Sequence, residues 1–179
     1  MHIKILRSKK RRRTVSARMV KDILIVRAPE SMPEGRLQKI VAEFKARIER
    51  KQLKEELNKR ENLAQRAKEF NLRYFENKLT IGSIEYVASQ NSKFGCCNYR
   101  TGRIRISHRV STMPQWVRDY VIIHELAHLA VPDHSRAFWD IVGRYKLAER
   151  ARGYLIGVGG LDGQNFLNGS QNEENCEVS

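Results

Sequence analysis

The stretch from about residue 114 to 130 constrains the fold most, because it predicts a helix that is apolar on nearly all sides. Pro114 stands where a helix tolerates proline, and Pro132 ends the run. Apolar side chains fall on every face between them: Val117, Tyr120, Val121, Ile122, Ile123, Leu126, Ala127 and Leu129. Such a helix is stable only where other elements surround it. The chain must therefore fold around a central buried helix, and its 179 residues suffice to build that core.

Two histidines and a glutamate interrupt this helix, in the order His124-Glu125-Leu126-Ala127-His128. Residues four apart share one helix face, so the imidazoles of His124 and His128 can converge on one cation. With a third protein ligand, they would leave one tetrahedral position for water, which is the arrangement of catalytic zinc. Glu125 is placed to take a proton from that water. The competing interpretation is a pair of core histidines bonded to backbone or carboxylate groups.

The third ligand requires a break in the helix. A residue six positions after His128 would lie about 240° around a continuous helix, too far to face the same metal. Pro132 supplies the break, so that His134 can turn back towards the site. Because imidazole suits zinc, His134 is the first candidate. The rival third ligands, which stay open, are Asp133, Asp140 and Glu149.

The same stretch resembles the YgjP-like metal-dependent hydrolases, also called the DUF45 group, which are related to the SprT-like zinc proteases. The family pattern is H-E-L-x-H, a short link, H-S and then a Phe-Trp pair; here it reads His124 to His128, His134-Ser135 and Phe138-Trp139. The resemblance covers roughly residues 1–155, including a segment Phe94-Gly95-Cys96-Cys97 that is similar to the family's Trp-Gly-Ser-Cys. It implies a zincin-like metallopeptidase fold, bound zinc held by His124, His128 and His134, and Glu125 as general base.

The rest of the chain predicts an α+β fold. Short strands are expected at 3–6, 13–20 and 22–28, followed by a helical region from about 34 to 70 with a break near 50–58. A strand at 83–89, a hairpin formed by 94–99 and 103–108, and a last helix from about 134 complete the prediction. We therefore expect N-terminal strands in residues 1–32 that pack on the core, a zincin-like metallopeptidase domain in 33–157 and a flexible tail in 158–179.

The charge is concentrated in the first third of the chain. Lys and Arg number 34 against 20 Asp and Glu, and residues 1–60 alone carry a net charge of +12. The basic run Lys9 to Arg13 is typical either of a solvated turn or of a contact with a polyanion. We expect weak, salt-sensitive binding of nucleic acid by this third. An alternative function follows, namely a nucleic-acid-associated protein in which the zinc site is structural or regulatory.

These observations predict a zinc-dependent hydrolase, a metallopeptidase, that acts on a protein or peptide. An extended substrate would add to the edge of the strand Arg103–His108. The residue that stabilises the oxyanion stays open among His108, Tyr99, Arg100, Arg103 and Tyr145, and Cys97 fits either a core thiol or a thiolate near the metal. No window approaches the ~20 apolar residues of a transmembrane helix, so no membrane is expected. Three cysteines, two of them adjacent, do not predict a disulfide framework, which favours the cytoplasm.

Overall fold

The computed structural model describes residues 2–159, and these divide into two compact units. The first unit ends at Gln52 and the second begins at Leu53. The predicted domain boundary at 32/33 marks the end of the N-terminal strands. The observed boundary lies later, within the helix that follows, so this helix belongs in part to each unit. The predicted tail lies, apart from its first two residues, outside the described residues.

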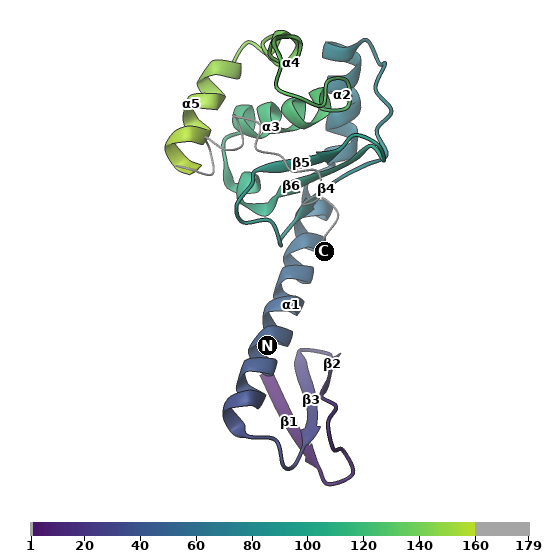
Figure 1. Ribbon diagram of the computed structural model, residues 1–179, viewed down its shortest axis with the longest axis vertical. Helices are drawn as coiled ribbons and strands as arrows, with labels where there is room; N and C mark the ends of the chain where they lie inside the picture. Colours follow the sequence, from purple (N-terminus) through teal and green to yellow (C-terminus); the bar gives the residue numbers. More distant parts are fainter. Residues whose placement is uncertain (1, 160–179) are drawn as a thin grey trace. The chain divides into compact units, whose positions relative to one another are not determined.

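The first unit contains a three-stranded sheet (Figure 1). Its strands are β1 (His2–Ser8), β2 (Ser16–Val20) and β3 (Ile23–Pro29), in the order β1-β3-β2. β3 is central, parallel to β1 and antiparallel to β2. Lys21, at φ 53°, forms the tight turn between β2 and β3 that the sequence predicted. The buried core of this unit joins alternate residues of β3 to the start of the following helix: Leu24, Val26, Ala28, Met32, Leu37 and Val41.

The predicted helical region forms two helices, α1 (Glu34–Arg60) and α2 (Leu63–Phe75). The break lies at residues 61–62, so its prediction near 50–58 was wrong. Asn62 causes the break, because its Oδ1 accepts a hydrogen bond of 3.0 Å from the Gln65 N–H and caps α2. The charged residues of this region have mixed signs both near 50–58 and near 61–62, so the charge pattern does not indicate where the helix breaks.

A second three-stranded sheet forms the base of the second unit. Its strands are β4 (Ser83–Val87), β5 (Gly95–Asn98) and β6 (Arg103–Ser107), in the order β4-β6-β5. β6 is therefore central, with β4 parallel and β5 antiparallel to it. The prediction that residues 103–108 offer an edge to the substrate was wrong, because both sides of β6 are already paired. The edge strands of this sheet are β4 and β5.

The remaining elements pack on this sheet or on the helix α3 (Gln115–Ala127) that covers it (Figure 1). They are the 3-10 helix η1 (His108–Thr112), α3 itself, α4 (Arg136–Val142) and α5 (Ala148–Gly159). α3 contacts α2, α4, α5, β5 and β6, so it is the central buried helix that its composition predicts. α5 was not predicted; it buries Ala148, Ala151 and Leu155 in the core. The α+β prediction is confirmed.

Two polar contacts fix the helices around α3. Arg66 of α2 donates to both carboxylate oxygens of Asp119 in α3, at 2.7 to 3.0 Å. Asn58 of α1 bonds both backbone groups of Tyr86 in β4, its Oδ1 accepting at 2.9 Å and its Nδ2 donating at 3.0 Å. Along the described part of the chain, 2–159, no helix has the length and apolarity that crossing a bilayer would need.

Candidate metal centre

The C-terminal end of α3 carries polar side chains into the core. His124 and Glu125 are completely buried, and His128 is 3% exposed. Their neighbours on the helix, such as Ile123 and Leu126, are also fully buried. The apolar surroundings mean that each polar group must find a partner inside the protein or bind a ligand.

The helix ends about three residues before its predicted end near residue 130, and this end returns the chain to the site. α3 stops at Ala127, and His128 still has helical angles, φ −65° and ψ −19°. The next turns are closed by short backbone hydrogen bonds, including Val131 N–H to the Ala127 carbonyl at 2.8 Å. The Ser135 N–H then donates to Asp133 Oδ1 at 3.2 Å and starts α4. His134 is thereby turned back towards α3.

The three histidines converge. The Nε2 atoms of His134 and His124 lie 3.1 Å apart. One ligand nitrogen from each of the three residues lies within 4.8 Å of the other two. A tetrahedral zinc with bonds of about 2.0–2.1 Å separates two ligand nitrogens by roughly 3.3 Å, so this spacing suits one ion.

Hydrogen bonding and burial prepare the imidazoles as ligands. His128 Nδ1 lies 3.0 Å from the Pro132 carbonyl, which can only accept, so this nitrogen carries the proton. Its Nε2 is buried and has no hydrogen-bond partner in the described structure, and therefore offers a free lone pair. Burial, with the other histidines, lowers the pKa of His128 to about 4 and holds the pKa of His124 well below its ordinary value. Burial also lowers the pKa of His134. Neutral imidazoles are the form that binds a metal.

Glu125 follows His124 in α3 and carries an unsatisfied carboxyl group. Both of its oxygens are buried, and neither has a hydrogen-bond partner among the described residues. Burial raises the pKa of Glu125 to about 8, although Lys93 opposes the shift. A buried carboxyl without partners is costly, and a cation beside it would lower this pKa again.

The rival third ligands lie at the surface. The side chains of Asp140 and Glu149 are 70% and 86% exposed, and Asp133 is exposed as well. The described residues bring only His134 to the two histidines of α3. Of the four candidates, His134 is thus the one whose position would allow it to share an ion with His124 and His128.

Two aromatic side chains of α4 cover the histidines. The Phe138 ring stacks on His128 with centroids 4.5 Å apart and meets His124 edge-on at 4.9 Å. Trp139 lies 5.4 Å from the ring of His134, and Arg152 lies over Trp139. These contacts hold the imidazoles in place and exclude water from one side of the cluster.

Other candidates from the sequence have different roles. The hydroxyl of Tyr145 donates to the Trp116 carbonyl at 3.0 Å, which makes it a structural group. His108 begins η1 instead of ending β6. Burial, with the charge of Glu125, raises the pKa of Cys97 far above its ordinary value, which favours the neutral core thiol over a thiolate.

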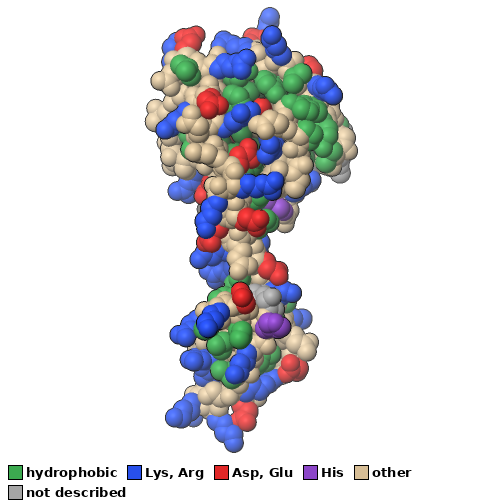
Figure 2. Space-filling model, turned by 180° about the vertical axis from the view of Figure 1, so that it is seen from behind, with side chains coloured by type: hydrophobic (Ala, Val, Ile, Leu, Met, Phe, Trp, Pro, Cys, Tyr) green, Lys and Arg blue, Asp and Glu red, His purple; other side chains and the backbone are tan. Residues whose placement is uncertain are grey.

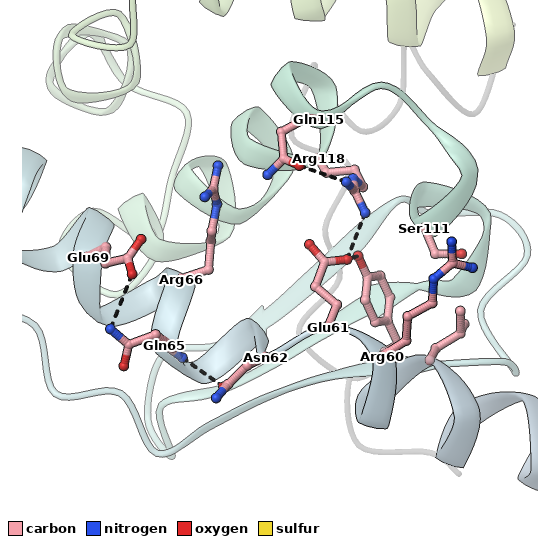
Figure 3. A pocket seen from close by; sticks show the side chains of 11 residues that line it. Arg60, Glu61, Asn62, Gln65, Arg66, Glu69, Ser111, Gln115 and Arg118 are labelled. Atoms are coloured by element: carbon pink, nitrogen blue, oxygen red, sulfur yellow. Dashed lines mark hydrogen bonds and ion pairs between the residues drawn. The ribbon is translucent and has the colours of Figure 1, made fainter.

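A separate cavity of about 470 Å³ lies at the junction of α1, α2 and α3 (Figure 3). Its lining includes Arg60, Gln65 and Gln115, but neither Glu125 nor any of the three histidines. Glu61 in its wall accepts from the Tyr86 hydroxyl at 2.7 Å and from Arg118 at 2.8 Å. These polar groups are largely satisfied by one another, so the cavity is not the candidate centre.

The sequence of this region matches a known family. Residues 83–147 fit the family model described as YgjP-like, metallopeptidase domain. This stretch is similar to the YgjP-like metallopeptidase domain. It spans β4 to α4 and contains Glu125 and the three histidines, whereas the strands of the first unit, α1, α2 and α5 lie outside it. The match supports a metal-dependent peptidase, and the matched residues include a histidine cluster that can hold an ion.

Among solved structures, the metallopeptidase zymogen of Pyrococcus abyssi abylysin is similar to part of the chain. The identity is 17% and the TM-score 0.47, over 54% of this chain and 93% of the other. No curated protein matches the chain.

Proposed function

We propose that this protein is a zinc-dependent peptidase that cleaves a protein or peptide substrate. His124, His128 and His134 would hold the zinc, and Glu125 would serve as general base. The proposal depends chiefly on one observation: the Nε2 of His128, which belongs to the histidine cluster, and the carboxyl group of Glu125, the residue next to His124, are both buried without a hydrogen-bond partner in the described structure. Both unsatisfied groups gain a partner when a cation and a water molecule bind there.

Zinc in this position supplies a Lewis acid that polarises the scissile carbonyl and makes water acidic near pH 7. Glu125 accepts the proton of the attacking water on a carboxylate oxygen as the new C–O bond forms. It returns that proton to the leaving nitrogen as the C–N bond breaks. Phe138 and Trp139 keep the histidine rings oriented during both steps.

An extended substrate has a binding edge beside Glu125. β5 is an edge strand and contacts α3, and its first residue, Gly95, lies against the Glu125 carboxylate. A peptide that pairs with β5 brings its backbone past this carboxylate. We propose β5 as the docking strand in place of β6.

The alternative of a structural zinc site has less support. Structural zinc is normally closed by four protein ligands, whereas a catalytic site keeps a position open. The cluster in residues 2–159 has three members, all histidines. An open fourth position favours catalysis.

The test compares the protein with Glu125→Gln. Unfolded casein-like chains are the first substrates, and zinc content is measured on the same samples. Gln keeps the shape but cannot accept the proton, so hydrolysis should fall on the order of 10²–10⁴-fold with zinc retained. Equal cleavage by both proteins would exclude Glu125 as the base.

A further inference from the structure

The outer side of β1 is an open sheet edge. Within the described residues, β1 pairs with β3 alone. The His2 N–H donates to the Asp22 carbonyl at 3.0 Å, and the Ser8 carbonyl accepts from Glu30 at 3.2 Å, so both His2 and Ser8 face β3. Successive residues of a strand turn their backbone groups to opposite sides. Ile3, Ile5 and Arg7 therefore direct their N–H and C=O groups away from the sheet.

Apolar side chains accompany this open edge. In the register of β1 and β3, Ile3 is opposite Leu24 and Ile5 is opposite Val26. Leu24 and Val26 are fully buried, whereas Ile3 and Ile5 are 41% and 40% exposed. The apolar face of the sheet is thus buried at β3 and continues to β1, where its side chains are partly exposed. One more strand would bury both isoleucines, and exposed apolar edges of this kind are sites where other chains add.

The surroundings of the edge are basic. Residues 1–52 contain 16 Lys and Arg against 5 Asp and Glu, a net charge of +11. Figure 2 shows Lys and Arg side chains spread over the visible face of this unit, with few acidic ones between them. Arg7 is paired with Glu34. Lys4, on the other face of β1, and Lys9 and Lys10 after it have no ion-pair partner in the described structure.

We propose that β1 binds an extended acidic segment of another protein, which adds to the sheet as a fourth strand. Its backbone would pair with Ile3, Ile5 and Arg7. Its side chains would alternate, with apolar residues beside Ile3 and Ile5 and acidic residues beside Lys4 and the following turn. This partner uses all three features of the edge: the free backbone groups, the exposed isoleucines and the positive charge.

Other occupants use fewer of these features. Nucleic acid would engage the charge but not the backbone edge, and β1, β2 and β3 contain no Phe, Tyr or Trp on which bases could stack. A second copy of this chain would bring two units of net charge +11 together.

The experiment measures binding of a labelled, blocked peptide of alternating Glu and Val to the full chain by fluorescence anisotropy. Glu125→Gln is used throughout so that cleavage cannot interfere. Ile5→Lys tests the edge, and Ile23→Lys is its matched control, because Ile23 is also 40% exposed but lies on the opposite face of the sheet. We expect at least tenfold weaker binding for Ile5→Lys and less than a threefold change for Ile23→Lys. Equal effects of the two variants would overturn the proposal.

A second measurement does not depend on a protein variant. Two peptides are N-methylated, each on a different set of alternate residues, so that only one of them loses the N–H groups that face β1. Added-strand binding predicts that one peptide binds and the other does not. Three outcomes would contradict the proposal. The two peptides could bind equally well, or the protein could dimerise through β1. A DNA duplex could also bind more tightly than the peptide and displace it, with no effect of Ile5→Lys on the DNA binding.

Discussion

Gly95 in β5 lies directly against the carboxylate of Glu125 in α3. A Cβ atom added to Gly95 would lie 2.7 Å from both Cδ and Cγ of Glu125, which is closer than two non-bonded carbon atoms can approach. The space between the strand and the helix thus admits a glycine and nothing larger. The backbone of β5 thereby fixes the position of the proposed general base. The contact between Gly95 and Glu125 thus links the proposed docking strand to this base.

Gly95→Ala should therefore reduce catalysis more than it reduces folding or zinc binding. The added methyl group must displace the Glu125 side chain, and we expect kcat to fall at least tenfold with zinc content unchanged. Overpacking should cost about 1–3 kcal/mol of stability. Peptide cleavage, zinc analysis and urea unfolding provide the measurements.

Gly153→Ala in α5 is the matched control, because a Cβ at Gly153 meets nothing within 4 Å. It should leave kcat unchanged. If Gly95→Ala is as active as Gly153→Ala, the contact does not position Glu125.

His128→Ala should remove zinc from the purified protein. The wild-type chain should carry close to one zinc, since three histidines converge and the fourth position is open. His108→Ala is the control, because His108 lies in η1 and does not belong to the cluster. Metal analysis after gel filtration distinguishes the two. Full occupancy in His128→Ala would contradict the ligand assignment.

The sequence predicted the centre because its information is local. Spacing of four places His124 and His128 on one helix face, and Pro132 shows that the helix must end before His134. The order β4-β6-β5 was not predictable in this way, because pairing between distant strands leaves no trace in the pattern of one strand. For the same reason the contact between Gly95 and Glu125, 30 positions apart in sequence, became visible only in the structure.

The position of one helix break and the whole of helix α5 were not predicted, for a different reason. The break at residues 61–62 depends on one capping side chain, Asn62, within a long charged segment that favours helix throughout. α5 contains Gly153 and Gly157, which lower intrinsic helix propensity, and tertiary burial of Leu155 outweighs that cost. The acidic-partner and nucleic-acid predictions for the first unit both remain predictions.

The ion pair between Arg66 and Asp119 should stabilise the second unit. Asp119→Ala leaves the guanidinium without its bidentate partner and should lower the free energy of unfolding by about 1–3 kcal/mol. Both tryptophans, Trp116 and Trp139, lie in this unit, so their fluorescence reports its unfolding. Asp140→Ala, which removes the exposed pair with Arg136 in the same unit, should change stability by less than about 0.5 kcal/mol. Equal effects would mean that the bidentate contact adds nothing.

Without metal, the buried carboxyl group should make the protein less stable as the pH rises. The pKa of Glu125 is raised to about 8 in the folded state from an ordinary value of 4.5, so the folded protein holds a proton that the unfolded chain has lost. Stability therefore falls with rising pH between these two values. The histidines act in the opposite direction, because their lowered pKa values cost stability as the pH falls below 6.5. From pH 6.5 to 8 the remaining histidine effect fades and partly offsets the decline, so the contribution of Glu125 is taken as the difference between the wild type and Glu125→Gln, and it should amount to about 1.5 kcal/mol. Urea unfolding of chelator-treated protein at both pH values measures this difference. The side chain in Glu125→Gln cannot ionise, so the free energy of unfolding of this variant should not fall with rising pH. If it falls as in the wild type, another group causes the pH dependence.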